Sequence, residues 1–232
     1  MSFVVSDYFG CSDMAAEFMF PQKILKEKKY TVLKNGVNVE KLSYDPDIRA
    51  EYRRKFELEN AFVIGNVGRF NVQKNHTLMI DIFAKLYKAD ASARLFLVGM
   101  GETEEATKEK VKQMGLQDVV YFNGPSSEVN KLMQMFDVVV MPSLYEGLPV
   151  VGVEAQAADV PLVLTDTITK ELQITDAVTY VPLDAELKSW VDAILDFKNH
   201  KRHDTSQLVR EAGFDIKATS EWLQNFYLGK EI

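Results

Sequence analysis

The 232-residue sequence lacks several features that would assign a protein class directly. Its single cysteine, Cys11, excludes an internal disulfide framework and fits a reducing cytoplasm. No run approaches the roughly 18 apolar residues that a membrane span needs. The first residues show no basic region followed by a long apolar run, as a secretory signal would. We therefore predict a cytoplasmic protein.

The sequence also lacks the patterns of two common classes of binding protein. Its formal net charge is −7, whereas binding nucleic acid needs clustered lysine and arginine, so we predict no nucleic-acid partner. A small anionic ligand is still compatible, because a pocket needs only one or two well-placed cations. His76, His200 and His203 have neither metal-ligand spacing nor partner acids, so we predict no metal site.

What the sequence does have is an alternation of short apolar runs and helical patterns, which is typical of repeated βα units. The expected strands are 31–34, 62–67, 94–98, 119–122, 137–142, 161–165 and 178–181, and the expected helices are 75–88, 102–114, 127–135, 149–158, 185–199 and 216–228. We predict an α/β fold: a Rossmann-like, doubly wound parallel sheet with helices on both faces. Ligands of such folds bind beyond the carboxyl ends of the strands, so the loops after Val67, Val98, Phe122 and Met141 form the candidate site.

Two cations lie in the loop after the strand 62–67. Arg69 and Lys74 are five positions apart, and a loop of this kind can bring both onto one diphosphate. Each charge-assisted hydrogen bond would contribute roughly 1.5–3 kcal/mol. The cations would also neutralise charge on a departing nucleoside diphosphate. Taken alone, however, this spacing favours two solvated loop cations.

Two acids, Glu146 and Glu154, follow the apolar strand 137–142. The amides of Gly147, Leu148 and Val150 lie between them at a predicted helix start, where an anion is favoured. A carboxylate just before such a site suggests contact with sugar hydroxyls, and a helical carboxylate among apolar residues would be satisfied by a ribose diol. The alternative is an acid complementing the helix dipole, worth roughly 0.3–1 kcal/mol, plus an acid at a helix edge.

Two glycines follow the strand 94–98. Gly99 and Gly101 would allow a ligand to approach the backbone closely, but a tight strand-to-helix turn explains them better. The third glycine and the downstream acid of a dinucleotide-binding fingerprint are missing. This pair is therefore a weak signal by itself.

The loop after the strand 119–122 could recognise a nucleotide base through its backbone. The residues concerned are Gly124, Pro125 and Val129. A plain turn, in which Ser126 or Ser127 caps the next helix, explains the same residues equally well.

Together these residues resemble the C-terminal, donor-binding domain of family 4 retaining glycosyltransferases, which have the GT-B architecture. The likeness runs from about Phe9 to the end of the chain and rests on six motifs in the family's order. These motifs are Phe9-Gly10-Cys11-Ser12, Lys34-Asn35-Gly36-Val37-Asn38, Gly68-Arg69 with Lys74-Asn75-His76, Leu97-Val98-Gly99-Met100-Gly101, Phe122-Asn123-Gly124, and Pro142-Ser143 through Glu154. Residues 143–149 and 165–169 are most similar to capsular or exopolysaccharide enzymes.

The resemblance implies roles for individual residues. Arg69 and Lys74 would hold the donor diphosphate, Glu146 would contact hydroxyls of the donor sugar, and Glu154 would bind the ribose. Amides at 147, 148 and 150 would face the phosphate. Glu146, Arg69 and Lys74 would act in catalysis, with a UDP-linked sugar as the expected donor. No cofactor is expected, because retention by front-face attack requires neither a nucleophile nor a metal.

The resemblance also implies a division of the chain. Residues 1–25 would be a remnant of an N-terminal domain with its linker, 26–205 the nucleotide-sugar-binding domain, and 206–232 the C-terminal helices. In the family, a preceding Rossmann-like domain binds the acceptor, here expected to be a glycan or lipid-linked. We therefore expect a truncated chain or a split gene, with weak nucleotide binding and little or no transfer alone. The full-length enzyme could contact the inner face of the plasma membrane peripherally.

Three alternative functions differ in the residues that they require. A GT-B nucleotide-sugar epimerase is disfavoured, because Arg69, Lys74 and the Glu146–Glu154 spacing point to transferases. A non-catalytic nucleotide-sugar-binding subunit, working with a separate acceptor-binding chain, stays open. A phospho-acceptor receiver domain would need paired acids after an early strand and a late lysine, and the sequence has no such set.

Overall fold

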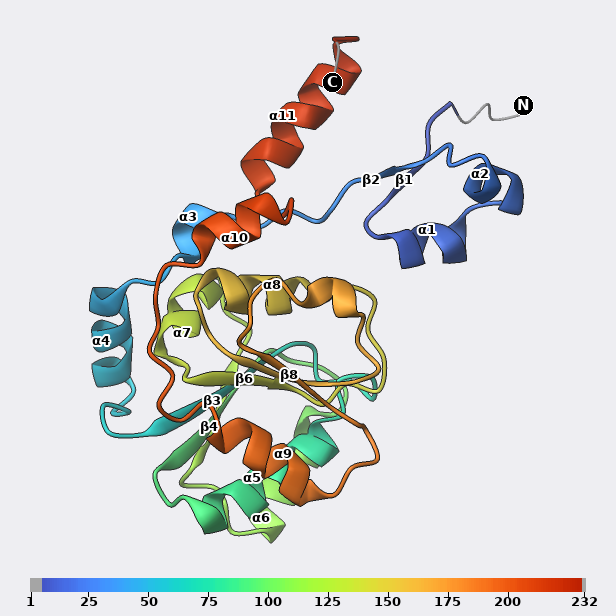
Figure 1. The fold of residues 1–232 in the computed structure, drawn as a ribbon. Coiled ribbons are helices and arrows are strands. Elements are labelled where there is room, and N and C mark those ends of the chain that lie inside the picture. Colours follow the sequence, from blue (N-terminus) through green and yellow to red (C-terminus); the bar gives the residue numbers. More distant parts are fainter. Residues whose placement is uncertain (1–5, 231–232) are drawn as a thin grey trace.

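The computed structural model describes residues 6–230 and has a six-stranded parallel sheet at its centre (Figure 1). The strands of this sheet are β3 (Phe62–Val67), β4 (Ala93–Val98), β5 (Val120–Gly124), β6 (Val138–Met141), β7 (Leu162–Thr165) and β8 (Val178–Val181). They lie in the order β5-β4-β3-β6-β7-β8, so the chain winds outward from β3 and then, in the other direction, from β6. This reversal makes the gap between β3 and β6 the topological switch point. The predicted α/β fold with a parallel sheet is confirmed.

Helices cover both faces of the sheet because its strands are apolar on both sides. Successive residues of a strand face opposite ways, so Val63 belongs to one core cluster and Ile64 to the other. Figure 1 shows helices on both faces of the sheet. The first face carries α7 (Val129–Met135) and α8 (Val150–Ala157), and the second carries α5 (His76–Ala89), α6 (Glu104–Gln113) and α9 (Leu187–Leu195). A short 3-10 helix, Lys170–Leu172, follows β7. Among residues 6–230, no helix combines the length and apolar character that crossing a bilayer requires.

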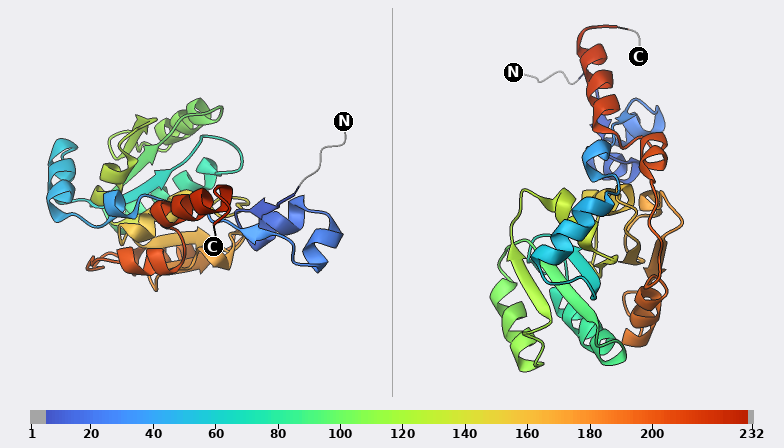
Figure 2. Two further views of the ribbon diagram at one scale, coloured as in Figure 1. Left: turned by 90° about the horizontal axis from the view of Figure 1, so that it is seen from above. Right: turned by 90° about the vertical axis from the view of Figure 1, so that its left-hand side faces the viewer.

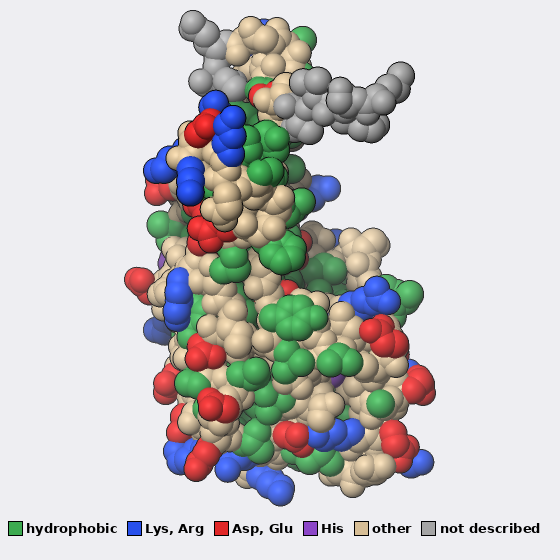
Figure 3. Space-filling view, turned by 90° about the vertical axis from the view of Figure 1, so that its right-hand side faces the viewer, with side chains coloured by type: hydrophobic (Ala, Val, Ile, Leu, Met, Phe, Trp, Pro, Cys, Tyr) green, Lys and Arg blue, Asp and Glu red, His purple; other side chains and the backbone are tan. Residues whose placement is uncertain are grey.

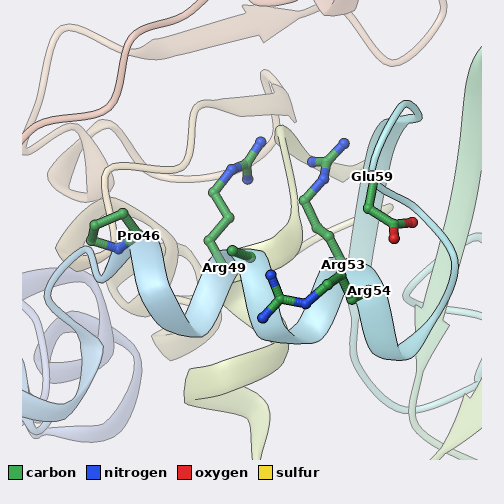
Figure 4. A pocket seen from close by; sticks show the side chains of 6 residues that line it. Pro46, Arg49, Arg53, Arg54 and Glu59 are labelled. Atoms are coloured by element: carbon green, nitrogen blue, oxygen red, sulfur yellow. The ribbon is translucent and has the colours of Figure 1, made fainter.

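Helix α4 (Pro46–Lys55) was not predicted from the sequence. It begins at Pro46 and is capped by the Asp45 side chain. Arg49 and Arg53 extend side by side from it (Figure 4), and both bind Asp137, the residue before β6. This ion-pair network joins α4 to the amino end of the sheet, opposite the predicted site. Two short helices, α3 (Val39–Leu42) and α10 (Ser206–Glu211), pack nearby against α8.

A smaller part of the chain lies beside the C-terminal helix in both views of Figure 2. It comprises β1 (Phe9–Gly10), α1 (Asp13–Met19), α2 (Gln22–Lys26) and β2 (Thr31–Val32), next to α11 (Ile216–Tyr227). The Phe9 ring lies 5.9 Å from that of Trp222 and 5.2 Å from that of Phe226. The strand predicted at 31–34 is shorter than expected, because β2 covers Thr31–Val32. It pairs with β1, outside the main sheet. The Val37 amide binds the Phe214 carbonyl at 2.7 Å, which directs this segment toward α11.

Candidate functional site

Two loops meet at the switch point of the sheet. One follows β3 and carries Arg69 and Lys74, and the other follows β6 and carries Glu146. A backbone hydrogen bond of 2.8 Å from the Leu144 amide to the Gln73 carbonyl joins the loops. The topology thus brings together predicted groups that lie 72 residues apart in sequence.

Lys74 and Glu146 form an ion pair between these loops. The Lys74 Nζ lies 2.5 Å from the Glu146 Oε1, and the two side chains are only 17% and 9% exposed. The Ser143 hydroxyl donates to the same oxygen at 3.0 Å, and the Gln73 side-chain amide donates to Oε2 at 3.3 Å. A largely buried ion pair needs such additional bonds, because its desolvation is costly. These contacts hold Glu146 in place and compensate the charge of Lys74.

Arg69 lies outside this ion pair, on an exposed part of its loop. Its side chain is 72% exposed and pairs with Glu102 at 3.4 Å, a surface contact that contributes little. The backbone of the loop is nevertheless fixed from the β4–α6 side. A methyl group on Gly99 would lie 1.9 Å from the Gly68 carbonyl oxygen. A methyl group on Gly101 would lie 2.2 Å from the Phe70 carbonyl oxygen of the same loop. The glycine pair therefore serves close backbone packing, while the Arg69 side chain can turn toward an anion.

Helix α8 begins directly after the Glu146 loop. Pro149 is its N-cap residue and provides no side-chain cap. Among residues 6–230, no backbone acceptor binds the amides of Gly147, Leu148 or Val150. Val150 begins the helix, where amides without an internal partner favour an anion. The contact of Gly147, Leu148 and Val150 with a phosphate stays a prediction.

Glu154 lies on the second turn of α8 and is partly buried. Burial alone raises the pKa of its carboxyl group, with no contribution from a charge or a hydrogen-bond donor of the described residues. A carboxylate in this setting costs folding free energy unless donors reach it. Two hydroxyl groups of a ligand would supply them.

The Glu146 loop also borders a pocket of about 410 Å³. Glu146, Gly147 and Leu148 line one side, and residues of α1 with the preceding Ser12, including Phe18, line the other. Figure 3 views the molecule from the side on which α1 and α2 lie in Figure 1, and hydrophobic side chains run down the middle of that face. The ion-paired carboxylate therefore adjoins a space that is mainly apolar.

The loop between β5 and α7 joins the same edge of the sheet. Gly124 has a left-handed φ of 69° and accepts a hydrogen bond of 3.0 Å from the Gly99 amide. Pro125 is exposed, and the Ser126 hydroxyl accepts a bond within the turn. Val129 begins α7, and its side chain packs against the core. At Val129 a ligand would therefore contact the backbone.

His76 is the first residue of α5, directly after the loop that carries Lys74, and is buried. Its ring stacks on Phe70, with centroids 4.0 Å apart and planes 8° apart. Neither ring nitrogen has a hydrogen-bond partner among the described residues. Burial and, to a lesser extent, the charge of Lys74 lower its pKa to about 4. His76 is therefore a neutral packing residue.

The prediction that the histidines lack partner acids is wrong for the other two. His200 Nε2 and His203 Nδ1 lie 3.2 Å and 2.9 Å from one oxygen of Asp159, which is buried. Asp159 precedes His203 by 44 residues, so spacing along the chain did not reveal the cluster. It lies before β7, at the amino end of the sheet and away from the site. Within residues 6–230, no group of three or more His, Cys, Asp or Glu side chains is arranged to hold a metal ion.

Comparison with known proteins decides the family of this chain. Residues 48–212, more than half of the sequence, match the family described as "Glycosyl transferases group 1". The chain belongs to this family. The protein EpsF of Bacillus subtilis (strain 168), which is named as a glycosyltransferase, is 31% identical over 223 residues, covering 94% of this chain and 58% of EpsF. The capsular polysaccharide biosynthesis glycosyltransferase CapM of Staphylococcus aureus is 30% identical over 170 residues, covering 71% and 44%.

Solved structures show the same fold. The crystal structure of Anabaena HepE in complex with UDP-glucose superposes with a TM-score of 0.75 over 97% of this chain and 64% of that one. The sequences are 18% identical, so the likeness concerns the fold alone. This chain spans about half the length of the curated relatives that it matches.

Two residues of the site were not predicted from the sequence. Gln73 and Ser143 both bind the Glu146 carboxylate. A signal was present, because Gln73 directly precedes Lys74 and Ser143 lies two residues after β6. Neither residue type implies such a contact unless the partner across the switch point is known.

Proposed function

We propose that this chain forms the donor-binding part of a glycosyltransferase of polysaccharide biosynthesis. It transfers a sugar from a UDP-linked donor, with retention of configuration, to a glycan or lipid-linked acceptor. The observation that carries this proposal is the contact of Lys74 with Glu146 at the switch point, beside the uncompensated amides that begin α8. The naming of CapM for capsular polysaccharide and the complex of HepE with UDP-glucose support the choice of pathway and donor. The acceptor binds to a further domain, the chain alone transfers little, and the location is the cytoplasm.

The donor diphosphate binds Arg69 and Lys74. Each cation is paired with a carboxylate, Arg69 with Glu102 and Lys74 with Glu146, so an incoming diphosphate competes for both. Each new charge-assisted bond contributes about 1.5–3 kcal/mol. The amides at the start of α8 add an electrostatic contribution of the same sign.

The two acids bind different parts of the donor. Glu146 borders the pocket beside the ion pair, where its oxygens accept hydroxyl hydrogens of the sugar. Glu154 lies on the next helix and lacks internal donors, so a ribose diol compensates its burial. The loop at Gly124 and Pro125 contacts the base through its backbone.

In the proposed reaction, the acceptor oxygen bonds to the anomeric carbon while the bond from that carbon to the diphosphate oxygen breaks. The electron pair of the broken bond stays on the phosphate, which also takes the acceptor's proton. Arg69 and Lys74 stabilise the charge that develops there. Glu146 already accepts bonds from Lys74, Ser143 and Gln73, which supports a substrate-holding role over a nucleophilic one.

A thermal-shift panel tests the proposal. The chain is heated with UDP, GDP, ADP and UDP-glucose, and we expect the UDP ligands to raise Tm most, because ligands that bind only the folded state stabilise it. Arg69→Ala should reduce the shift, whereas Arg94→Ala, at a side chain that donates to the nearby Ala91 and Ala93 carbonyls, should not. If none of the four ligands raises Tm, the proposed function is wrong.

A further inference from the structure

We propose that Gln73 and Ser143 are positioning residues that fix the Glu146 carboxylate for the donor sugar. This inference rests on the function proposed above. The two residues reach the carboxylate from opposite sides of the switch point, Gln73 from the loop after β3 and Ser143 from the loop after β6.

Gln73 connects the two loops through three hydrogen bonds. Its carbonyl oxygen accepts from the Leu144 amide at 2.8 Å. Its side-chain amide donates to the Tyr145 carbonyl at 2.9 Å and to the Glu146 Oε2 at 3.3 Å. One residue therefore binds three consecutive residues of the opposite loop. Because Gln73 directly precedes Lys74, the position of Glu146 is tied to that of the cation.

Ser143 holds the other carboxylate oxygen from a rigid base. It is 1% exposed, close to the end of β6. Its hydroxyl donates to the Glu146 Oε1 at 3.0 Å, and its carbonyl accepts from the Thr167 hydroxyl at 3.2 Å. Thr167 follows β7, so a third strand of the sheet contributes to the orientation of Glu146.

The Glu146 carboxylate can accept bonds from a ligand while Gln73 and Ser143 hold it. A carboxylate offers about four lone-pair sites. Lys74 and Ser143 occupy two of these sites on Oε1, and Gln73 occupies one on Oε2. One site on Oε2 is open already, and a second opens on Oε1 when Lys74 moves to the diphosphate, while Gln73 and Ser143 still hold the group. Two hydroxyl hydrogens of a sugar can then be bound by a carboxylate that needs no reorientation.

Calorimetric titration of two variants tests the proposal. In Gln73→Ala and Ser143→Ala, we expect UDP to bind within about twofold of the wild-type affinity and UDP-glucose to bind about fivefold or more weakly, the loss of one hydrogen bond to a charged group. Gln113→Ala is the control, because Gln113 is a surface residue whose side chain donates to Glu109 on its own helix. Equal losses for both ligands would mean that the variants disturb the whole site, and no loss for either would mean no role; both results overturn the inference.

The proposed function and this inference can fail separately. If wild-type protein binds neither UDP nor UDP-glucose, the proposed function fails, and the positioning role for a donor sugar fails with it. Hydrogen exchange without ligand then shows whether Gln73 joins the loops. Gln73→Ala keeps the backbone bond to the Leu144 amide and removes the side-chain bonds to Tyr145 and Glu146. If those side-chain bonds hold the loops together, the Leu144 amide should exchange faster in Gln73→Ala than in Gln113→Ala. Unchanged exchange would contradict a role of the Gln73 side chain in joining the loops.

Discussion

The Lys74 Nζ lies 2.5 Å from the Glu146 Oε1, between two loops that the strand order places side by side. The cation proposed to bind the donor diphosphate is therefore already paired with the acid proposed to bind the donor sugar. A bound diphosphate would compete with Glu146 for Lys74. The affinity for a nucleoside diphosphate then depends on the strength of a contact inside the protein.

Glu146→Gln should separate recognition of the diphosphate from recognition of the sugar. The neutral amide releases Lys74, so we expect UDP to bind as tightly as to the wild type or a few-fold more tightly. UDP-glucose should lose affinity relative to UDP, because an amide replaces two acceptor oxygens with one. Calorimetry with both ligands measures the ratio, and Glu221→Gln, on the exposed surface of α11, is the control. A parallel loss for both ligands would contradict this division of roles.

Glu154→Gln should stabilise the fold and lower the affinity for UDP. Burial raises the pKa of Glu154, so between its unfolded and folded pKa values the folded chain binds more protons, and stability falls as the pH rises. The amide avoids this cost, and we expect a higher Tm than wild type at about pH 8 and no difference at about pH 4. Glu221→Gln should change neither quantity. A lower Tm at the higher pH, with UDP affinity retained, would disprove the assignment.

His76 should make stability depend on pH in the acidic range. Its pKa is lowered from 6.5 to about 4 in the folded chain, so only the unfolded chain binds a proton between these values. The free energy of unfolding is therefore unaffected by His76 above pH 6.5. It decreases as the pH falls toward 4, by about 3 kcal/mol in total. Urea unfolding of wild type and His76→Phe across this range measures the difference. If the free energy of unfolding changes with pH equally in the two proteins, His76 is not held neutral in the folded chain.

Gly99→Ala should disturb the loop that carries Arg69. The added methyl group would lie 1.9 Å from the Gly68 carbonyl oxygen, so we expect a loss of about 3 kcal/mol of unfolding free energy and weaker UDP binding. Gly115→Ala is a matched control, because Gly115 also has positive φ but open space around it. It should cost only about 1 kcal/mol. Similar losses in both variants would mean that the backbone conformation, and not the contact with Gly68, requires Gly99.

The six strands of the main sheet were predictable because each is a short apolar run with a turn on either side. Once those strands are parallel, their ends lie at one edge, and Lys74 and Glu146 must be neighbours there. The sequence therefore indicated the two residues that form the ion pair at the candidate site. Which of the two cations contacts Glu146 depends on loop conformation, and the sequence could not distinguish Lys74 from Arg69.

Features held by long-range polar contacts were not predictable. Helix α4 has little apolar pattern, and its Arg49 and Arg53 bind Asp137 more than 80 residues away. Asp159 binds His203 across a shorter separation of 44 residues. The strand at 31–32 finds its partner in β1 and not in the main sheet. In each case the residues involved look like ordinary surface positions until the fold brings their partners close.

The most direct test of the central claim is calorimetric titration of UDP into wild-type protein and Lys74→Ala. Lys188→Ala, an exposed lysine paired one helical turn away with Asp192, serves as control. We predict that the wild type and the control bind UDP equally and that Lys74→Ala binds about tenfold or more weakly, the loss of one charge-assisted contact to the diphosphate. Equal affinity of all three proteins for UDP would contradict a diphosphate site at the switch point.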